Sequence, residues 1–131
     1  MLRILEQTDL SKYSDVTADL QLTPFDELHI SEAAESDGVK GFIVYSYTPE
    51  AVTIHALEDG GDLNYCDGLV RSVLFKAELK GIERAVFRIE APEMHKRLEM
   101  LRFVQNGQNV LENIAAIMDS CKSCKENHGT T

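Results

Sequence analysis

The side chains with the most recognisable chemistry lie near the end of the chain. Cys121, Cys124 and His128 offer three zinc ligands, because a Cys-x-x-Cys pair can place two thiolates on one metal ion. Zinc takes four donors, so a fourth would come from Cys66 or another histidine. Without a second such pair we expect reduced, non-catalytic thiols here, with a metal-binding tail as the weaker alternative. Cys66 differs, because a nearby helix N-terminus would lower the pKa of its thiol.

Composition restricts the classes of partner. The chain has 131 residues, 44% of them apolar, which suits one globular domain with its own core. Thirteen basic residues against 22 acidic ones give a net charge of −9. Nucleic-acid binding needs a basic surface, and anionic membranes repel an acidic one, so we expect neither partner. The start of the sequence has no signal-peptide pattern and no apolar run could span a bilayer, so we expect a cytoplasmic protein.

Alternating apolar and polar residues predict the first half of the fold. Residues 9–26 read as a short helix and a loop that ends at Pro24. Three strands then follow at 27–33, 39–47 and 51–57, separated by turn signals, so they form an antiparallel meander. In the third strand, Val52, Ile54 and Ala56 should share one face of the sheet.

The second half begins with the acidic loop 58–62 and then changes to a helical period. A helix from about Asn64 or Asp67 to residue 80 would bury one apolar face, with Asp67 as a plausible N-cap and Gly81 just past its end. A strand at 85–90 and a helix beginning at Pro92 follow. The final apolar stretch, 110–118, fits a strand or a helix. The residues expected in the buried face of the first helix are Leu69, Val70, Val73, Leu74 and Ala77.

This order of elements predicts a mixed α/β (α+β) fold. A helix between the third strand and the next one implies a parallel crossover, so an antiparallel meander is followed by a β-α-β-α unit. We expect a single domain over residues 1–120 and a polar, cysteine-containing tail over 121–131.

The order of elements resembles the acetyl-CoA-dependent N-acetyltransferases of the GNAT superfamily. Leu69-Val70 with Gly81 twelve residues on is similar to the helix that follows that family's cofactor loop. The segment 97–103, RLEMLRF, resembles the penultimate helix, which often ends in Gly-Phe. The resemblance covers roughly residues 28–118. It implies a GNAT-like mixed sheet, acetyl-CoA as cofactor and transfer of an acyl group to an amine.

The cofactor loop is where this sequence departs from the family. That loop typically reads Arg/Gln-x-x-Gly-x-Gly/Ala, and its amides hold a pyrophosphate. The matching positions are Gly61, Asn64 and Cys66, so the arginine and the glycine pair are missing, although nearby glycines could restore a tight turn. Carboxylates surround the loop, and one such charge about 4 Å from another opposes it by about 4 kcal/mol. The resemblance implies these cofactor contacts: Ala56, Leu57, Glu58, Gly60, Gly61, Asn64, Cys66, Asp67 and Gly68.

Acyl transfer also needs a base for the amine and an acid for the thiolate. The tyrosine that many family members use as the acid is replaced by Leu98, which cannot donate a proton, so Tyr65 in the loop is the substitute candidate. His55, Glu58 and Glu90 are the candidate bases. Alternation turns His55 outward, which also fits an ordinary surface residue. For Glu58 the alternative is a solvated turn. A backbone N–H near residues 56–58 would polarise the thioester oxygen, as the resemblance implies.

Two functions therefore stay open. One is an acetyl-CoA-dependent N-acyltransferase with a degenerate loop, whose acidic surroundings favour a small cationic amine as acceptor. The other is a catalytically inactive GNAT-like binding or regulatory module. The loop separates them: amides of residues 60–68 converging on space for an anion favour the enzyme, and Asp side chains or Tyr65 filling that space favour the module. A homodimer is compatible with both.

Overall fold

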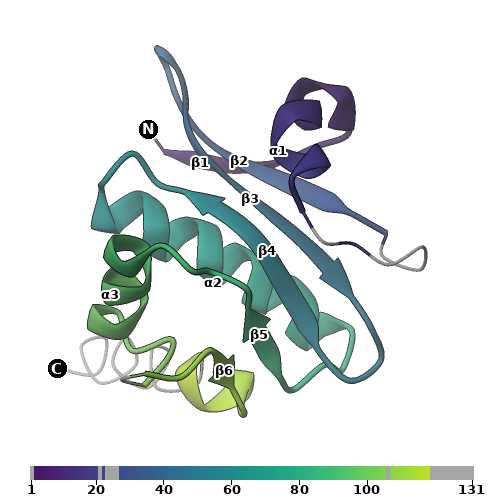
Figure 1. Cartoon of the computed structure of the whole chain (residues 1–131), viewed down its shortest axis with the longest axis vertical. Coiled ribbons are helices and arrows are strands. Elements are labelled where there is room, and N and C mark those ends of the chain that lie inside the picture. The colour runs from purple at the N-terminus through teal and green to yellow at the C-terminus, as the bar shows by residue number, and fades with distance from the viewer. Residues whose placement is uncertain (1, 21, 23–26, 106, 119–131) are drawn as a thin grey trace, which may run out of the picture.

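A computed structural model describes residues 2–20, 22, 27–105 and 107–118. Its sheet follows chain order, with β4 and β5 parallel and every other neighbouring pair antiparallel (Figure 1). This is the predicted meander followed by a crossover. The strands are β1 Arg3–Gln7, β2 His29–Glu35, β3 Gly38–Tyr47, β4 Val52–Glu58, β5 Ala85–Phe87 and β6 Val110–Leu111.

Helices lie on both faces of this sheet. The helix α2, Leu63–Leu79, makes the crossover between β4 and β5 and packs on the sheet. The short helices η1, Leu10–Tyr13, and α1, Ser14–Ala18, follow β1. Tyr13 of η1 contacts the Phe42 ring, with centroids 4.6 Å apart. The helix α3, Pro92–Met100, starts at its predicted proline.

Three elements differ from the expectations. The chain begins with strand β1, which we did not predict, because an exposed edge strand shows little alternation. The predicted strand 85–90 ends at Phe87, and the residues after it leave the sheet. The stretch 110–118 contains both structures that its pattern allowed, since β6 is followed by a helical segment at 114–118. The expected boundary at residue 120 and the tail 121–131 lie outside the described residues.

A bulge changes which side of β4 faces the core. Tyr45 of β3 pairs with Ile54, but the next residue back, Val44, pairs with Ala56, so His55 is the extra residue. The expected face of Val52, Ile54 and Ala56 is therefore wrong after the bulge: Leu57 enters the core and Ala56 is half-buried. His55 is also not the outward-facing side chain that alternation suggested, since only 5% of it is exposed.

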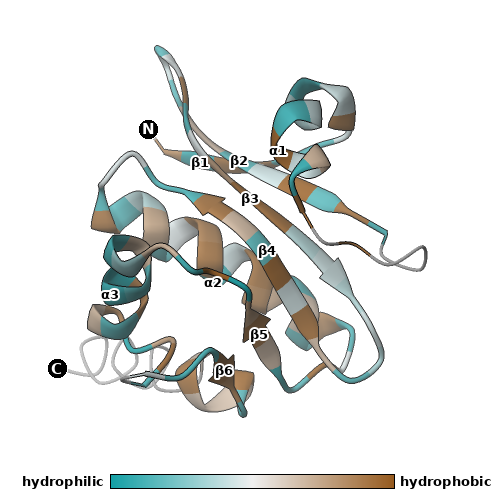
Figure 2. Ribbon diagram, in the orientation of Figure 1, coloured by the Kyte–Doolittle hydropathy of each residue, from teal (hydrophilic) through white to brown (hydrophobic). Residues whose placement is uncertain are grey.

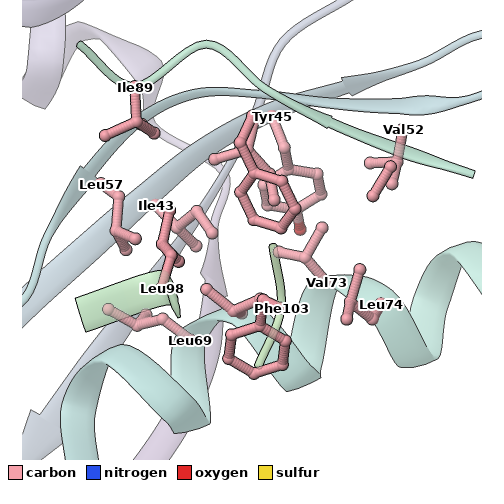
Figure 3. Close-up of a cluster of buried hydrophobic side chains, with 14 of the residues drawn as sticks. Ile43, Tyr45, Val52, Leu57, Leu69, Val73, Leu74, Ile89, Leu98 and Phe103 are labelled. Atoms are coloured by element: carbon pink, nitrogen blue, oxygen red, sulfur yellow. The ribbon is translucent and has the colours of Figure 1, made fainter. Parts of the chain in front are cut away.

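The core lies between α2 and the sheet. All five residues expected in the buried face of α2 are fully buried, and Cys66 joins them. Each buried Val or Leu contributes about 1.5–3 kcal/mol of hydrophobic stabilisation. Figure 2 shows hydrophobic residues concentrated along β4 and β5, whereas α3 is largely hydrophilic. Figure 3 shows the packed side chains: Leu69, Val73 and Leu74 of α2, Ile43 and Tyr45 of β3, Leu98 of α3 and Phe103 just after it.

The ends of α2 fix where the loops on either side begin. Its N-cap is Asp62, whose side chain accepts a hydrogen bond from the Asn64 amide, and not the expected Asp67. Its C-terminal end matches the expectation, since Gly81 has φ +77° in the position after the cap. No helix among the described residues is both long and apolar enough to cross a membrane.

Candidate functional site

A cleft opens where β4 and β5 separate. The two strands pair only between Val52–Ile54 and Ala85–Phe87, and the last link is the Arg88 amide donating to the Ile54 carbonyl at 2.8 Å. Beyond it, β4 continues beside β3 while the chain after β5 turns toward α3 (Figure 1). The cleft between them has a volume of about 490 Å³. The bulge at His55 lies just where the strands part, and bulges are frequent beside functional sites.

The three candidate bases all line this cleft. His55 and Glu58 reach it from β4 and Glu90 from the segment after β5, although Glu90 is far from the other two in sequence. The Nε2 atom of His55 shares a hydrogen bond of 2.8 Å with the Ser46 hydroxyl on β3, which holds the ring in place. Their roles as bases stay predictions.

Tyr65, the candidate acid, lies elsewhere. It is in the first turn of α2 and not in a loop, and it does not line the cleft. Partial burial raises the pKa of Tyr65, and the negative charges of Glu35 and Asp62 raise it further. Glu35 ends β2, so this side chain faces the hairpin of β2 and β3. Tyr65 is therefore in the helix and not in the loop where the sequence analysis placed it, and its role as the acid stays a prediction.

The loop between β4 and α2 is shorter than the resemblance suggested. Because α2 starts at Leu63, the connection consists of residues 59–62 alone. Several residues expected as loop positions for a cofactor are in the first turns of the helix instead: Asn64, Cys66, Asp67 and Gly68. Gly60 and Gly61 do lie in the loop, with φ values of +63° and +78° that favour glycine.

Carboxylates of this same chain bond the amides of the loop. The Gly60 amide donates to Glu58 Oε1 and the Gly61 amide to Asp59 Oδ1, each at 2.8 Å. The Asn64 amide donates to Asp62 Oδ1, also at 2.8 Å. In addition, the Asp62 amide is bonded to the Asp59 carbonyl. The sequence left open whether these amides would be free for an anion or occupied by Asp side chains. In the described loop, Asp side chains accept hydrogen bonds from the Gly61 and Asn64 amides.

A buried ion pair ties this loop to α3. Asp59 is fully buried, and Arg97 donates two hydrogen bonds to its carboxylate, from Nε to Oδ2 at 2.7 Å and from Nη2 to Oδ1 at 2.9 Å. This contact raises the pKa of the Arg97 guanidinium above its ordinary value. Sequence reasoning missed the pair, because its members are 38 residues apart and no local pattern links them.

Cys66 lies behind the same pair and is not activated. Burial, followed by the charge of Asp59 and a hydrogen bond to it, raises the pKa of the Cys66 thiol to about 12. The expectation of a lowered pKa at the helix N-terminus is wrong, since the thiol is buried against a carboxylate. Cys121, Cys124 and His128 lie outside the described residues.

The end of α3 keeps the shape of a glycine cap without the glycine. Arg102 has φ +67° and donates its amide to the Glu99 carbonyl, while the Phe103 amide donates to Leu98. These two bonds form a Schellman motif, and the buried side chains of Leu98 and Phe103 supply its usual hydrophobic contact. Arg102 therefore stands where the resembling helices have glycine.

Comparisons with known proteins identify the fold. No family model matches the chain, and no curated protein is detectably similar in sequence. Among solved structures, it is similar to a ribosomal-protein-alanine N-acetyltransferase from Brucella melitensis biovar Abortus 2308, with 16% identity, a TM-score of 0.61, and coverage of 83% of this chain and 96% of that one. It also resembles a "putative acetyltransferase" from Exiguobacterium sp. 255-15, with 14% identity, a TM-score of 0.53, and coverage of 92% and 98%. The chain has a GNAT-like fold.

Proposed function

We propose that this chain is a catalytically inactive GNAT-like binding or regulatory module. The observation that carries the proposal is that the amides of Gly60 and Gly61 in the loop, and of Asn64 in the first turn of α2, are bonded to the chain's own carboxylates. In the resembling enzymes such amides would hold the cofactor's pyrophosphate. Here the Asp59 carboxylate accepts from the Gly61 amide and from two donors of Arg97, so an anion reaches that amide only if the buried Asp59 carboxylate moves away.

The electrostatic energies also disfavour pyrophosphate binding at this loop. A helix N-terminus stabilises a neighbouring anion by about 0.3–1 kcal/mol at a surface. A single carboxylate about 4 Å from a phosphate charge opposes it by about 4 kcal/mol at the effective dielectric of such sites. Glu58 and Asp62 flank the loop and carry such charges without an Arg or Lys partner at salt-bridge distance among the described residues. Pyrophosphate binding would therefore be opposed more strongly than the helix favours it.

The charge of the residues that line the cleft favours a small cationic ligand for this module. Three of its lining residues are glutamates, Glu58, Glu90 and Glu93, against Arg88 and the already neutralised Arg97. Its volume suits a small molecule. The proposal therefore takes an amine as ligand. The net charge of −9 supports a protein without nucleic-acid or membrane partners, and the proposal also assigns it to the cytoplasm.

An acetyl-CoA-dependent N-acyltransferase is the second candidate. The separation of β4 and β5 beside a bulge favours it, because His55, Glu58 and Glu90 are gathered at that point. In that reaction the amine nitrogen attacks the thioester carbon, a base takes the amine proton, the carbon–sulfur bond breaks, and the thiolate is protonated as it leaves. Tyr65, the predicted acid, is not among the residues that line the cleft.

Thermal unfolding with acetyl-CoA and with CoA, at low and moderate salt, separates the two functions. The module predicts no saturable shift at millimolar cofactor. The transferase predicts a saturable shift, since ligand at a hundredfold excess over its Kd adds about 2.7 kcal/mol of stability. The same assay with butylamine and its neutral isostere butanol tests the ligand class. Stabilisation by butylamine alone supports a cationic ligand, and equal effects contradict it.

A further inference from the structure

A second pocket lies near the opposite end of α2 from the cleft. It has a volume of about 380 Å³ and is formed between the last turns of the helix and strands β1 to β3. Since α2 has 17 residues, its two ends are about 25 Å apart, and no residue lines both hollows. The lining residues are Glu6, His29, Tyr47, Lys76, Leu79 and Lys80.

Aromatic rings form the floor of this pocket. Tyr45, Tyr47 and His29 contact one another, with ring centroids 5.2–5.6 Å apart. Tyr45 is fully buried beneath, whereas Tyr47 and His29 are half-buried and reach the pocket. Leu79 stands at the rim with 73% of its surface exposed, the largest exposed fraction among the large apolar residues of the described chain. A flat apolar ligand would therefore find both a ring surface and an aliphatic wall.

Two lysines one helical turn apart give the pocket a positive charge. Lys80 Nζ lies 5.0 Å from the Tyr47 ring centroid and is exposed. Lys76 Nζ is held by the Tyr45 hydroxyl at 3.1 Å and by Glu6 at 3.7 Å. Glu6 is the pocket's one carboxylate, and it is shared with His29, at 3.5 Å. A protein of net charge −9 thus brings two ammonium groups against one carboxylate here.

We propose that this pocket binds a small aromatic monocarboxylate. Its ring would lie against Tyr47 and Leu79 while its carboxylate meets the ammonium groups of Lys80 and Lys76. The geometry selects this class against others: the two lysines repel a cation, and the carbonyls at the C-terminal end of α2, with Glu6, oppose an anion of several charges. A pocket of this volume is at the small end of the range for small-molecule sites.

The Tyr47 hydroxyl adds a hydrogen-bond donor. Burial raises the pKa of Tyr47 above its ordinary value, with the charge of Glu6 among the further causes. The Tyr47 hydroxyl donates its proton to Tyr45 in the free protein, and a ligand carboxylate beside Lys80 would accept that proton instead. A carboxylate that accepts from both a hydroxyl and an ammonium group is bound more strongly than by either alone.

Amide NMR spectra of the full chain, titrated with benzoate, test the proposal. We expect saturable shifts confined to the amides around His29, Tyr47 and residues 76–80. The neutral isostere benzamide and the cationic benzylamine should bind at least fivefold more weakly, and cyclohexanecarboxylate should also lose affinity because it has no planar ring.

Two variants and a matched control locate the site. Lys80→Gln removes the exposed charge and Tyr47→Leu removes the ring, and each should weaken benzoate binding at least fivefold. Lys96→Gln removes an exposed lysine on α3, outside the pocket, and should leave the affinity unchanged. Thermal unfolding of each variant checks that it is folded.

Three results would overturn the proposal. The first is no saturable shift with benzoate at tens of millimolar. The second is equal binding of benzamide, which would mean that the lysines only offset the dipole of α2. The third is a set of shifts that maps to the β4–β5 cleft instead.

Discussion

The two ends of helix α2 differ in the charged side chains that surround them. At its N-terminal end, amides that could hold an anion are bonded to Glu58, Asp59 and Asp62, and Arg97 completes the closure. Near its C-terminal end, Lys76 and Lys80 border a pocket lined by aromatic rings. On the proposed function, the difference teaches that a GNAT-like fold does not by itself provide an anion site at the N-terminal end of this helix. The residues of the short loop decide whether its amides are available.

Breaking the Asp59–Arg97 ion pair at the N-terminal end of α2 should have the largest effect on the free energy of unfolding. Arg97→Leu leaves the fully buried Asp59 carboxylate without its partner, and the loss of one member of such a pair costs about 3–5 kcal/mol. Urea unfolding measures it. The neighbouring exposed residue is the control, since Lys96→Ala should change the stability by less than about 0.5 kcal/mol. A loss below about 1 kcal/mol for Arg97→Leu would contradict the buried pair.

The C-terminal ends of α2 and α3 offer the next comparison. Both have a left-handed residue after the cap, Gly81 in one helix and Arg102 in the other. Because a side chain in that conformation costs about 1–2 kcal/mol, Arg102→Gly should raise the free energy of unfolding by about 1 kcal/mol and Gly81→Ala should lower it by a similar amount. Thermal unfolding of the two variants checks the opposite signs. Destabilisation by Arg102→Gly would mean that the Arg102 side chain makes a stabilising contact of its own.

The position of the N-cap can be tested by a pair of aspartates. Asp62→Ala removes the acceptor for the Asn64 amide and should cost about 1 kcal/mol. Asp67→Ala, at the cap expected from sequence, loses a partly buried i,i+4 pair with Arg71 and should cost about 0.5 kcal/mol. Chemical denaturation of both proteins ranks them, and the reverse order would move the helix start to Asp67.

Replacing a histidine on α3 should change the free energy of unfolding least, and the change should depend on pH. His95 contacts the Gln108 carbonyl through Nε2 at 2.8 Å and Glu99 through Nδ1 at 3.0 Å, and these contacts raise the pKa of His95 above its ordinary value. The stabilisation is therefore complete below the pKa of the unfolded state and is lost as the pH rises through the higher pKa of the folded state. Stability relative to His95→Gln, measured across that range, should fall with rising pH. A constant difference would show that the charged form is not preferred.

The fold was largely predictable because its signals are local. The 3.6-residue period of α2 identified its buried face, and Gly81 marked its end. Leu57 and His55 were misplaced because a bulge interrupts alternation, and the bulge depends on pairing with β3. For the N-cap, the sequence analysis named Asp67 and missed Asp62, because only the connection from β4 shows that the helix begins at Leu63.

The site was less predictable for a different physical reason. His55, Glu58 and Glu90 could be proposed from residue type, and the fold brings them to one cleft. The closure of the loop depends on Arg97, which approaches Asp59 only when α3 packs beside α2. Tyr65 was misplaced because the early start of α2 turns it toward the β2–β3 hairpin. Contacts between distant segments leave no periodic signal in the sequence.

The most direct test of the central claim follows the amides of Gly60, Gly61 and Asn64 by NMR while acetyl-CoA is added to the unmodified protein. Because these amides are bonded to Glu58, Asp59 and Asp62, we predict that their resonances do not move up to millimolar cofactor. Saturable shifts of all three would mean that an anion displaces the carboxylates. That result would contradict the closed loop and make the acyltransferase the better account.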